Sequence, residues 1–209
     1  MTINLHNNRL CLRQISWNLI KAFLLAPVLC CRSEALHIQA QVVSARAGQV
    51  CHAQGEALYH RHEDQEDRGV SQLEVGTILN NGDIVFTNGS SYVEWLLTPD
   101  SYLRVANNSN VQVNETSLDH MRFDITRGEV FITLRSLEKG AELVIKTPPS
   151  LLTISKPGIY RIVVAANGET SADVRQGELQ YVDSQGKLSA IKKGKRVRFY
   201  KPESSGHPQ

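Results

Sequence analysis

Apolar and polar residues alternate along most of the chain beyond its first 40 residues. Val93, Trp95 and Leu97, for example, alternate with Tyr92 and Glu94. A period of two places successive side chains on opposite faces of a strand, so this pattern predicts half-buried β-strands. The segments that carry it are 84–87, 92–97, 103–105, 111–113, 123–125, 130–134, 143–145, 152–154, 160–164, 179–181 and 197–199. No long stretch keeps a helical stripe, so the sequence predicts an all-β domain with very little helix outside the first 40 residues.

Turn residues separate these segments, and five turns contain a glycine that is followed directly by a strand. These glycines are Gly55, Gly82, Gly128, Gly177 and Gly194, at spacings of 27, 46, 49 and 17 residues. Such spacings are too irregular for a strict repeat array. The recurrence predicts a single domain folded as a twisted β-solenoid-like or rolled antiparallel sheet with glycine at its corners. The alternative is that glycine simply precedes many β-strands.

Residues 1–40 differ from the rest of the chain. Three basic residues precede the apolar run 22–31, and small residues follow at Ala35 and Ala40. This order is typical of a secretory signal peptide. The run is shorter than the roughly 20 residues that span a bilayer as a helix, and Pro27 interrupts it. We expect cleavage near Ala35 or Ala40 and a periplasmic or secreted domain that is not an integral membrane protein; the alternatives are an uncleaved anchor or a buried helix.

The predicted cleavage changes the charge of the domain. The whole chain has 23 Lys and Arg against 21 Asp and Glu, a formal net charge of +2. The leader contains four of these basic residues and one of the acidic ones, which leaves 19 basic and 20 acidic residues and a net charge of −1. A domain with this balance has no overall attraction for nucleic acid or for an anionic membrane, so we expect no nucleic-acid partner.

Cleavage also leaves Cys51 as the single cysteine. One cysteine cannot form an internal disulfide, so we expect Cys51 to be a free thiol packed as a small hydrophobic residue. The polar segment 61–72 is expected to be a solvated loop between a first hairpin and the main sheet. Residues 202–209 are expected to form a flexible tail, so the domain is assigned to residues 41–201.

Several short motifs follow one another along the chain. The first has the form G-D-x-[IVL]-x-T, and later motifs contain G-E-V, V-x-T-P and three further glycine-containing strands. They are Gly82–Thr87 (GDIVFT), Gly128–Val130 (GEV), Val144–Pro148 (VIKTP), Pro157–Ile162 (PGIYRI), Val174–Leu179 (VRQGEL) and Ile191–Lys195 (IKKGK). In their order and spacing these motifs resemble the FecR domain family, and the resemblance covers about residues 42–199.

This resemblance implies an extracytoplasmic β-domain with a solenoid-like fold. Members of the family named for iron-dicitrate sensing relay a signal from the outer membrane to a cytoplasmic sigma factor. They have a cytoplasmic segment of several tens of residues before a transmembrane helix, whereas only about 20 residues precede the apolar run here. We therefore expect a stand-alone, exported FecR domain.

The sequence contains no local motif of a hydrolase, metalloprotease, redox dithiol, P-loop or dinucleotide-binding enzyme, so we expect no catalytic activity and no cofactor. The best candidate for metal chemistry is Cys51 and His52 with His60 and His62. Thiolate and imidazole are ligands for zinc or copper. A hairpin turning near Gly55 would bring the two pairs together; the alternative is a surface hairpin with solvated histidines.

Aromatic residues offer a second kind of candidate site. Tyr92 and Tyr102 flank one predicted hairpin and are candidates for a sugar platform, whereas the alternation places Trp95 in the core. The basic run at 192–201 is expected to be a charge-guarded edge strand, with Arg196 and Arg198 facing water. Together these observations predict a binding or sensing module in envelope signalling whose partner is an envelope protein. The alternatives are a protein that binds the cell wall or a cell-surface polysaccharide, and a metal-binding periplasmic protein.

Overall fold

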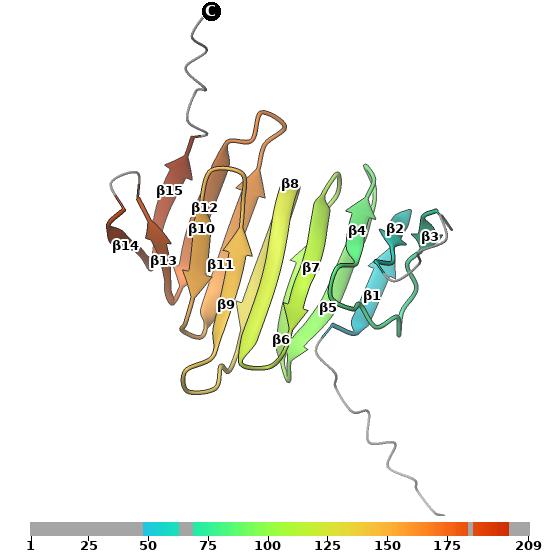
Figure 1. The fold of residues 1–209 in the computed structure, drawn as a ribbon, viewed down its shortest axis with the longest axis horizontal. Coiled ribbons are helices and arrows are strands. Elements are labelled where there is room, and N and C mark those ends of the chain that lie inside the picture. The colour runs from blue at the N-terminus through green and yellow to red at the C-terminus, as the bar shows by residue number, and fades with distance from the viewer. Residues whose placement is uncertain (1–47, 63–68, 184–185, 201–209) are drawn as a thin grey trace, which may run out of the picture. The chain divides into compact units, whose positions relative to one another are not determined.

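The computed structural model describes residues 48–62, 69–183 and 186–200, which contain fifteen β-strands and no helix (Figure 1). The prediction of an all-β fold is therefore confirmed for these residues. None of them forms a helix with the length and hydropathy needed to cross a membrane. The predicted leader, residues 63–68 of the predicted loop and the predicted C-terminal tail lie outside the described residues.

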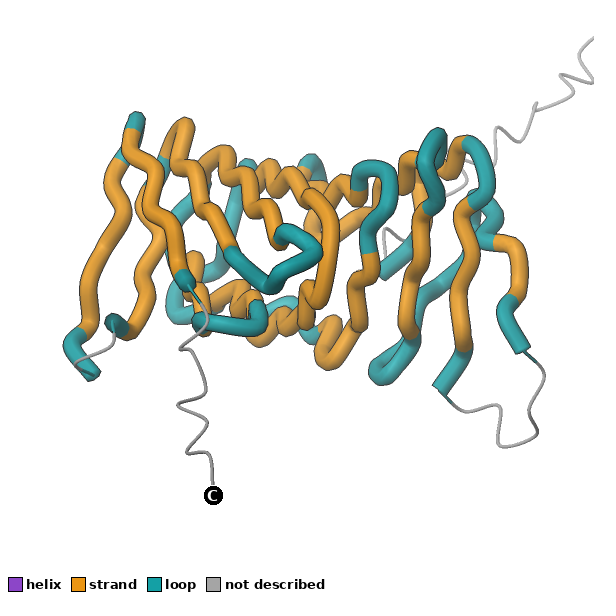
Figure 2. The backbone as a smooth tube through the Cα atoms, turned by 90° about the horizontal axis from the view of Figure 1, so that it is seen from above, coloured by secondary structure: helices purple, strands orange, loops and turns teal. Residues whose placement is uncertain are grey.

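The strands are hydrogen-bonded into one open sheet that is folded into two layers (Figure 1, Figure 2). The first layer contains, from edge to edge, β14 (Leu188–Lys192), β13 (Glu178–Val182), β10 (Leu151–Ile154), β9 (Glu142–Lys146), β8 (His120–Leu134), β7 (Asn110–Thr116), β4 (Ile84–Thr87), β2 (Ala57–His60) and β3 (Ser71–Gln72). The second layer contains β1 (Val50–Gln54), β5 (Tyr92–Thr98), β6 (Ser101–Val105), the second half of β8, β11 (Gly158–Val164), β12 (Thr170–Gln176) and β15 (Lys195–Phe199).

Strand β8 belongs to both layers. Its first half pairs with β7 and β9, and its second half pairs with β6 and β11. Gly128 lies between the two halves with a φ of 99°, a backbone conformation that a residue with a Cβ adopts only with strain. Because β8 leaves the first layer at this point, the next strand of that layer, β9, runs parallel to it. The other strand pairs among the described residues are antiparallel.

Successive segments of the chain alternate between the layers. β5 and β6 lie in the second layer, β7 in the first, β9 and β10 in the first, β11 and β12 in the second, β13 and β14 in the first, and β15 in the second. All five glycines that the sequence placed at corners have a positive φ: Gly55, Gly82, Gly128, Gly177 and Gly194. Gly128, however, lies inside a continuous 15-residue strand rather than between two separate strands.

The hydrophobic core lies between the two layers and consists of the inward side chains of the alternating pattern. Trp95, from the second layer, is fully buried, and its ring lies 5.7 Å from that of Phe123, from the first layer. The predicted core position of Trp95 is therefore confirmed. Full burial of a large apolar side chain contributes about 1.5–3 kcal/mol, so these interlayer contacts are the main reason that the two layers stay together.

Two predictions about the N-terminal part of the domain are wrong. β1 pairs with β5 in the second layer, whereas β2 pairs with β3 and β4 in the first, so the turn at Gly55 joins two layers and does not close a hairpin. The segment 61–72 is not entirely loop, because Ser71 and Gln72 form β3 beside β2.

The prediction that Cys51 is packed in the core is also wrong. The register of β1 against β5 shifts between Val50 and His52, which is a β-bulge or a similar irregularity. A bulge interrupts the alternation of faces. As a result Val50 is buried while Cys51 and His52 are both exposed.

Candidate functional site

A row of chemically distinctive side chains crosses the outer face of the second layer. Direct cross-strand partners lie on the same face of a sheet and within contact distance of one another. The register places His52, Glu94, Arg104, Phe131, Arg161, Asp173 and Arg196 in one such row, one residue from each of β1, β5, β6, β8, β11, β12 and β15. This row forms the centre of the candidate site.

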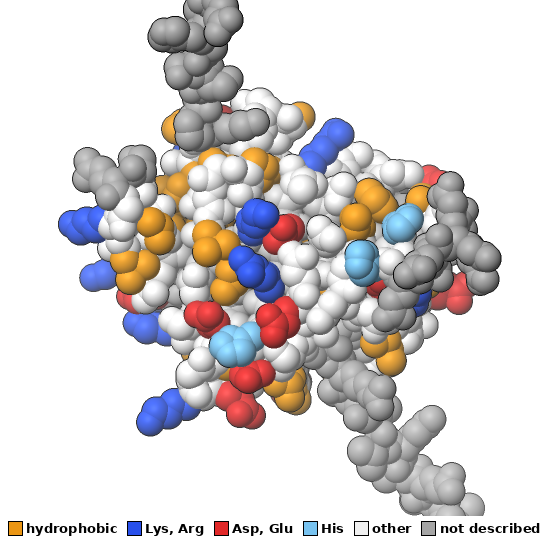
Figure 3. Space-filling model, viewed as in Figure 1, with side chains coloured by type: hydrophobic (Ala, Val, Ile, Leu, Met, Phe, Trp, Pro, Cys, Tyr) orange, Lys and Arg blue, Asp and Glu red, His pale blue; other side chains and the backbone are white. Residues whose placement is uncertain are grey.

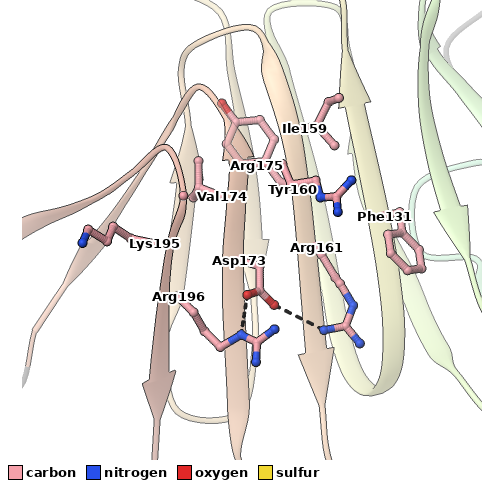
Figure 4. A pocket seen from close by; sticks show the side chains of 10 residues that line it. Phe131, Ile159, Tyr160, Arg161, Asp173, Val174, Arg175, Lys195 and Arg196 are labelled. Atoms are coloured by element: carbon pink, nitrogen blue, oxygen red, sulfur yellow. Dashed lines mark hydrogen bonds and ion pairs between the residues drawn. The ribbon is translucent and has the colours of Figure 1, made fainter.

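Charged side chains at one end of the row are linked to one another. Asp173 lies between two guanidinium groups: Arg161 Nη1 donates to Asp173 Oδ2 at 3.3 Å, and Arg196 Nε donates to Asp173 Oδ1 (Figure 4). Arg161 Nε also donates to Glu129 Oε1 at 2.5 Å. Hydrogen bonding to Glu129 raises the pKa of Arg161 above its ordinary value. The guanidinium of Arg161 is therefore permanently charged and held in one orientation.

A second cluster lies farther along the same face. Arg104 pairs with Glu94 through Nε and donates from Nη1 to the hydroxyl of Thr133 at 2.9 Å. The guanidinium carbon of Arg104 lies 5.4 Å from the centre of the Tyr102 ring, and that of Arg161 lies 5.8 Å from the centre of the Phe131 ring. Both distances are within the range of cation–π attraction. Aromatic and cationic groups thus alternate across the face.

The face is hollowed at the first of these clusters. A hollow of about 770 Å³ is lined by Phe131, Ile159, Arg161 and Asp173, together with residues of β12 and β15 (Figure 4). Phe131 and Ile159 are 37% and 39% exposed despite being apolar. Exposed apolar surface framed by charged groups is typical of interaction sites.

The opposite face of the domain, the outer face of the first layer, has a different character. Acidic, basic and histidine side chains are intermingled there (Figure 3). Lys146 Nζ lies 3.5 Å from Asp124 Oδ2, and His120 Nδ1 lies 4.0 Å from Glu142 Oε1. Such exposed pairs contribute little to stability or to specificity. We therefore place the candidate site on the second layer.

Both tyrosines predicted as a sugar platform lie on the outer face of the second layer. Tyr102 lines a hollow of about 400 Å³ together with Arg104, Thr133 and two other residues. Tyr92 is half-buried, its hydroxyl donates to Glu94 Oε2 at 3.2 Å, and its ring lies 5.7 Å from that of His52. Desolvation, and after it the negative charge of Glu94, raises the pKa of Tyr92. A ligand role for these two residues stays a prediction.

The four residues proposed as metal ligands are not brought together. Cys51 and His52 lie on β1 of the second layer, whereas His60 ends β2 of the first layer and His62 follows it. The hairpin that would have joined the two pairs is not formed. Among the described residues no group of three or more His, Cys, Asp or Glu side chains is arranged to hold a metal ion.

The exposed Cys51 thiol should react slowly for a surface cysteine. Desolvation and the nearby charge of Glu94 both raise its pKa, so less of the reactive thiolate is present at neutral pH. The rate of alkylation by iodoacetamide can be measured at a series of pH values by mass spectrometry of the Cys51 peptide. The pH at which this rate is half-maximal should lie above the ordinary cysteine pKa. Glu94→Gln should move this midpoint down, whereas Glu138→Gln, in a distant loop, should leave it unchanged. A midpoint at or below the ordinary value would contradict the prediction.

Two buried motif residues, Asp83 and Tyr160, hold corners of the fold, whereas Arg161 of the Pro157–Ile162 motif belongs to the row. Asp83 is fully buried, and its carboxylate accepts hydrogen bonds from the backbone N–H groups of His62 and Asn80. The buried Tyr160 hydroxyl donates to the Lys156 carbonyl at 2.7 Å and accepts from the Glu178 N–H at 3.2 Å. The motifs that can be recognised in the sequence therefore report the architecture of the domain. The charged row depends on strand register, and no local sequence signal identifies it.

Comparison with known proteins found one family model and similar solved structures. Two crystal structures of a candidate anti-sigma factor from Parabacteroides distasonis, at 2.50 and 1.65 Å resolution, are similar to this chain with TM-scores of 0.48 and 0.47 and 11% sequence identity. Each match covers 57% of this chain, and the chain spans only 55% and 56% of those proteins. No curated protein matches the chain. The family model described as FecR protein matches residues 83–180, which include the central strands of both layers, and these residues are thus identified as a FecR domain.

Proposed function

We propose that this protein is an exported, non-catalytic binding module that acts as a sensor in cell-envelope signalling. The FecR domain at residues 83–180 supports a role in signalling. The leader-like residues 1–40 support export. The alternation of successive segments between two layers gives the second layer one broad outer face that a partner can contact.

The observation that carries the proposal is the charged row on that face. Its side chains come from seven strands, and their positions are fixed by ladder pairing and by mutual ion pairs. Groups that are held in place before binding lose little conformational freedom when a partner binds. The row is therefore a preformed surface that is suited to recognising a partner.

The sensing role can be tested in the organism that carries the gene. Deleting the gene should change the transcript levels of a defined set of genes, and the wild-type protein should restore them. The double variant Arg175→Glu, Arg198→Glu, which reverses two charges on the second layer, should fail to restore them. The matched variant Arg122→Glu, Lys192→Glu on the first layer should restore them fully. Unchanged transcripts after deletion, or recovery of the protein in the cytoplasmic fraction, would exclude the proposal.

A second candidate function, binding of an envelope polysaccharide, is favoured by the position of Tyr102. Its ring lies beside Arg104 at a hollow of the candidate site. Aromatic rings next to guanidinium groups are suited to sugar rings that carry negative charge.

A further inference from the structure

We infer that the outer face of the second layer contains a continuous groove that binds a carboxylate-bearing polysaccharide. This inference rests on the proposed function of the chain as a binding module and names the class of ligand. Three features carry it: the continuity of the groove, its local charge, and the kinds of groups that it offers to a ligand.

Three hollows on this face adjoin one another, and we take them together as one groove. The hollow at Tyr102 shares Thr133 and Arg135 with a small central hollow, and this central hollow shares Ile159 with the hollow of about 770 Å³. Together they cross β6, β8, β11, β12 and β15. Four interstrand spacings of about 4.8 Å correspond to a length of roughly 19 Å. A groove of this length accommodates several units of an extended polymer.

The groove is basic within a domain that has almost no net charge. Six basic side chains line it against two carboxylates, an excess of four positive charges; they are Arg104, Arg135, Arg161, Arg175, Lys195 and Arg196, against Asp100 and Asp173. Including Glu94 and Glu129, which pair with Arg104 and Arg161 from its margins, still leaves an excess of two. The groove is therefore complementary to an anionic ligand.

Its arginines are of two kinds. Arg104, Arg161 and Arg196 are fixed by the row carboxylates of Glu94 and Asp173. Arg135 and Arg175 are exposed, and no carboxylate of the described residues lies within ion-pair distance of either. A guanidinium fork matches a carboxylate with two parallel hydrogen bonds. These two arginines, one toward each end of the groove, are the groups available to bind ligand carboxylates.

The floor of the groove favours sugar rings over a peptide. Backbone groups of β6, β8, β11 and β12 are used in ladder pairing on both sides of each strand. A peptide lying across them would find no backbone partners for its own N–H and C=O groups, whose desolvation is costly. Sugar hydroxyls and carboxylates, in contrast, can be satisfied by side chains, and the half-buried Tyr102 and the exposed Phe131 and Ile159 offer apolar contact to the ring faces.

Binding to defined polymers tests this inference. The purified protein is titrated at physiological ionic strength with end-labelled oligogalacturonate or oligomannuronate, and fluorescence anisotropy measures the affinity. The same oligomers with methyl-esterified carboxylates are the matched neutral ligands, and poly-L-glutamate represents an acidic peptide. We expect saturable binding of at least one uronate and about tenfold or more weaker binding of its ester, because each charge-assisted contact is lost.

Variants locate the site. Arg135→Gln combined with Arg175→Gln should weaken uronate binding by about tenfold or more, and Tyr102→Ala should weaken it to a smaller extent. Arg122→Gln combined with Lys192→Gln removes the same charge from the first layer and should leave the affinity unchanged. Urea unfolding transitions of the variants, compared with that of the wild type, establish that each one is folded.

Several outcomes would overturn the inference: no uronate binding, equal binding of the esters, equal loss of binding in both double variants, or tighter arginine-dependent binding of poly-L-glutamate. The last outcome would assign the groove to an acidic peptide. If uronates do not bind but the transcript response depends on Arg175 and Arg198, the ligand class is wrong and the sensing role stands. If deletion leaves transcripts unchanged, the sensing role is wrong whatever the groove binds.

Discussion

Replacing Gly128 by alanine should lower the free energy of unfolding by about 3–5 kcal/mol. Gly128 has a φ of 99°, and a Cβ at this position would overlap the Cα and Oγ atoms of Ser109. Ser109 cannot move away easily, because its hydroxyl accepts a hydrogen bond from the Glu129 N–H at 3.0 Å and its own N–H donates to Thr87 Oγ1 at 2.9 Å. The substitution thus combines backbone strain with a clash at the point where β8 changes layers.

Gly140→Ala separates these two causes. Gly140 also has a positive φ, 88°, but a Cβ there would meet no atom within 4 Å. This variant should lose only the cost of the strained backbone, about 1 kcal/mol. Urea unfolding at equilibrium measures both variants, and the midpoint should shift much more for Gly128→Ala at a similar slope. Equal shifts for the two variants would show that Gly128 is not packed as described.

Replacing Asp83 by alanine should destabilise the protein by about 2–4 kcal/mol. The side chain is fully buried, with its two oxygens 3.0 Å from the His62 nitrogen and 2.9 Å from the Asn80 nitrogen. Alanine would leave both N–H groups without their acceptor. It would also remove the carboxylate whose Oδ2 lies 3.9 Å from Arg61 Nη1.

Two further variants calibrate this effect. Asp83→Asn keeps the shape of the side chain and one carbonyl oxygen, so its loss of stability should be smaller than that of alanine. Asp119→Ala removes an exposed carboxylate and should change stability by no more than about 0.5 kcal/mol. Thermal unfolding measures all three. The structural role assigned to the Gly82-Asp83 motif is wrong if Asp83→Ala unfolds at the wild-type temperature.

The strands and corners of this fold could be predicted from the sequence because both depend on local properties. Alternation marks each strand that has one buried face, as in β5, where Val93, Trp95 and Leu97 are buried. Glycine marks turns that require a positive φ, as at Gly82 and Gly177. These signals involve a few neighbouring residues and need no knowledge of the tertiary structure.

Features that depend on the path between layers could not be predicted in this way. Arg127-Gly128-Glu129 has the composition of a turn, yet the strand continues through it because β6 and β11 pair with the residues that follow. Likewise, Gly55 is followed by a strand of the other layer, so the expected hairpin is not formed. Local propensity does not specify which strand becomes the partner.

The candidate site was the least predictable feature. Arg104, Arg161 and Arg196 are separated by 57 and 35 residues in the sequence, and only the combined register of four strand pairs aligns them. The sequence predicted that Arg196 faces solvent on an edge strand, and this is confirmed. It did not predict that Asp173 of the neighbouring strand binds Arg196 and Arg161 together.

The shared strand also has a consequence for how the chain reaches its folded state. β8 pairs with β6, β7, β9 and β11, all of which are close to it in the order of the chain. Bringing such neighbours together closes only short loops, and short loops cost less entropy than long ones. Ordering the middle of the chain first would create pairing edges in both layers at once, at β7 and β9 on one side and at β6 and β11 on the other. The remaining strands could then add outward in both directions, with the two layers growing together.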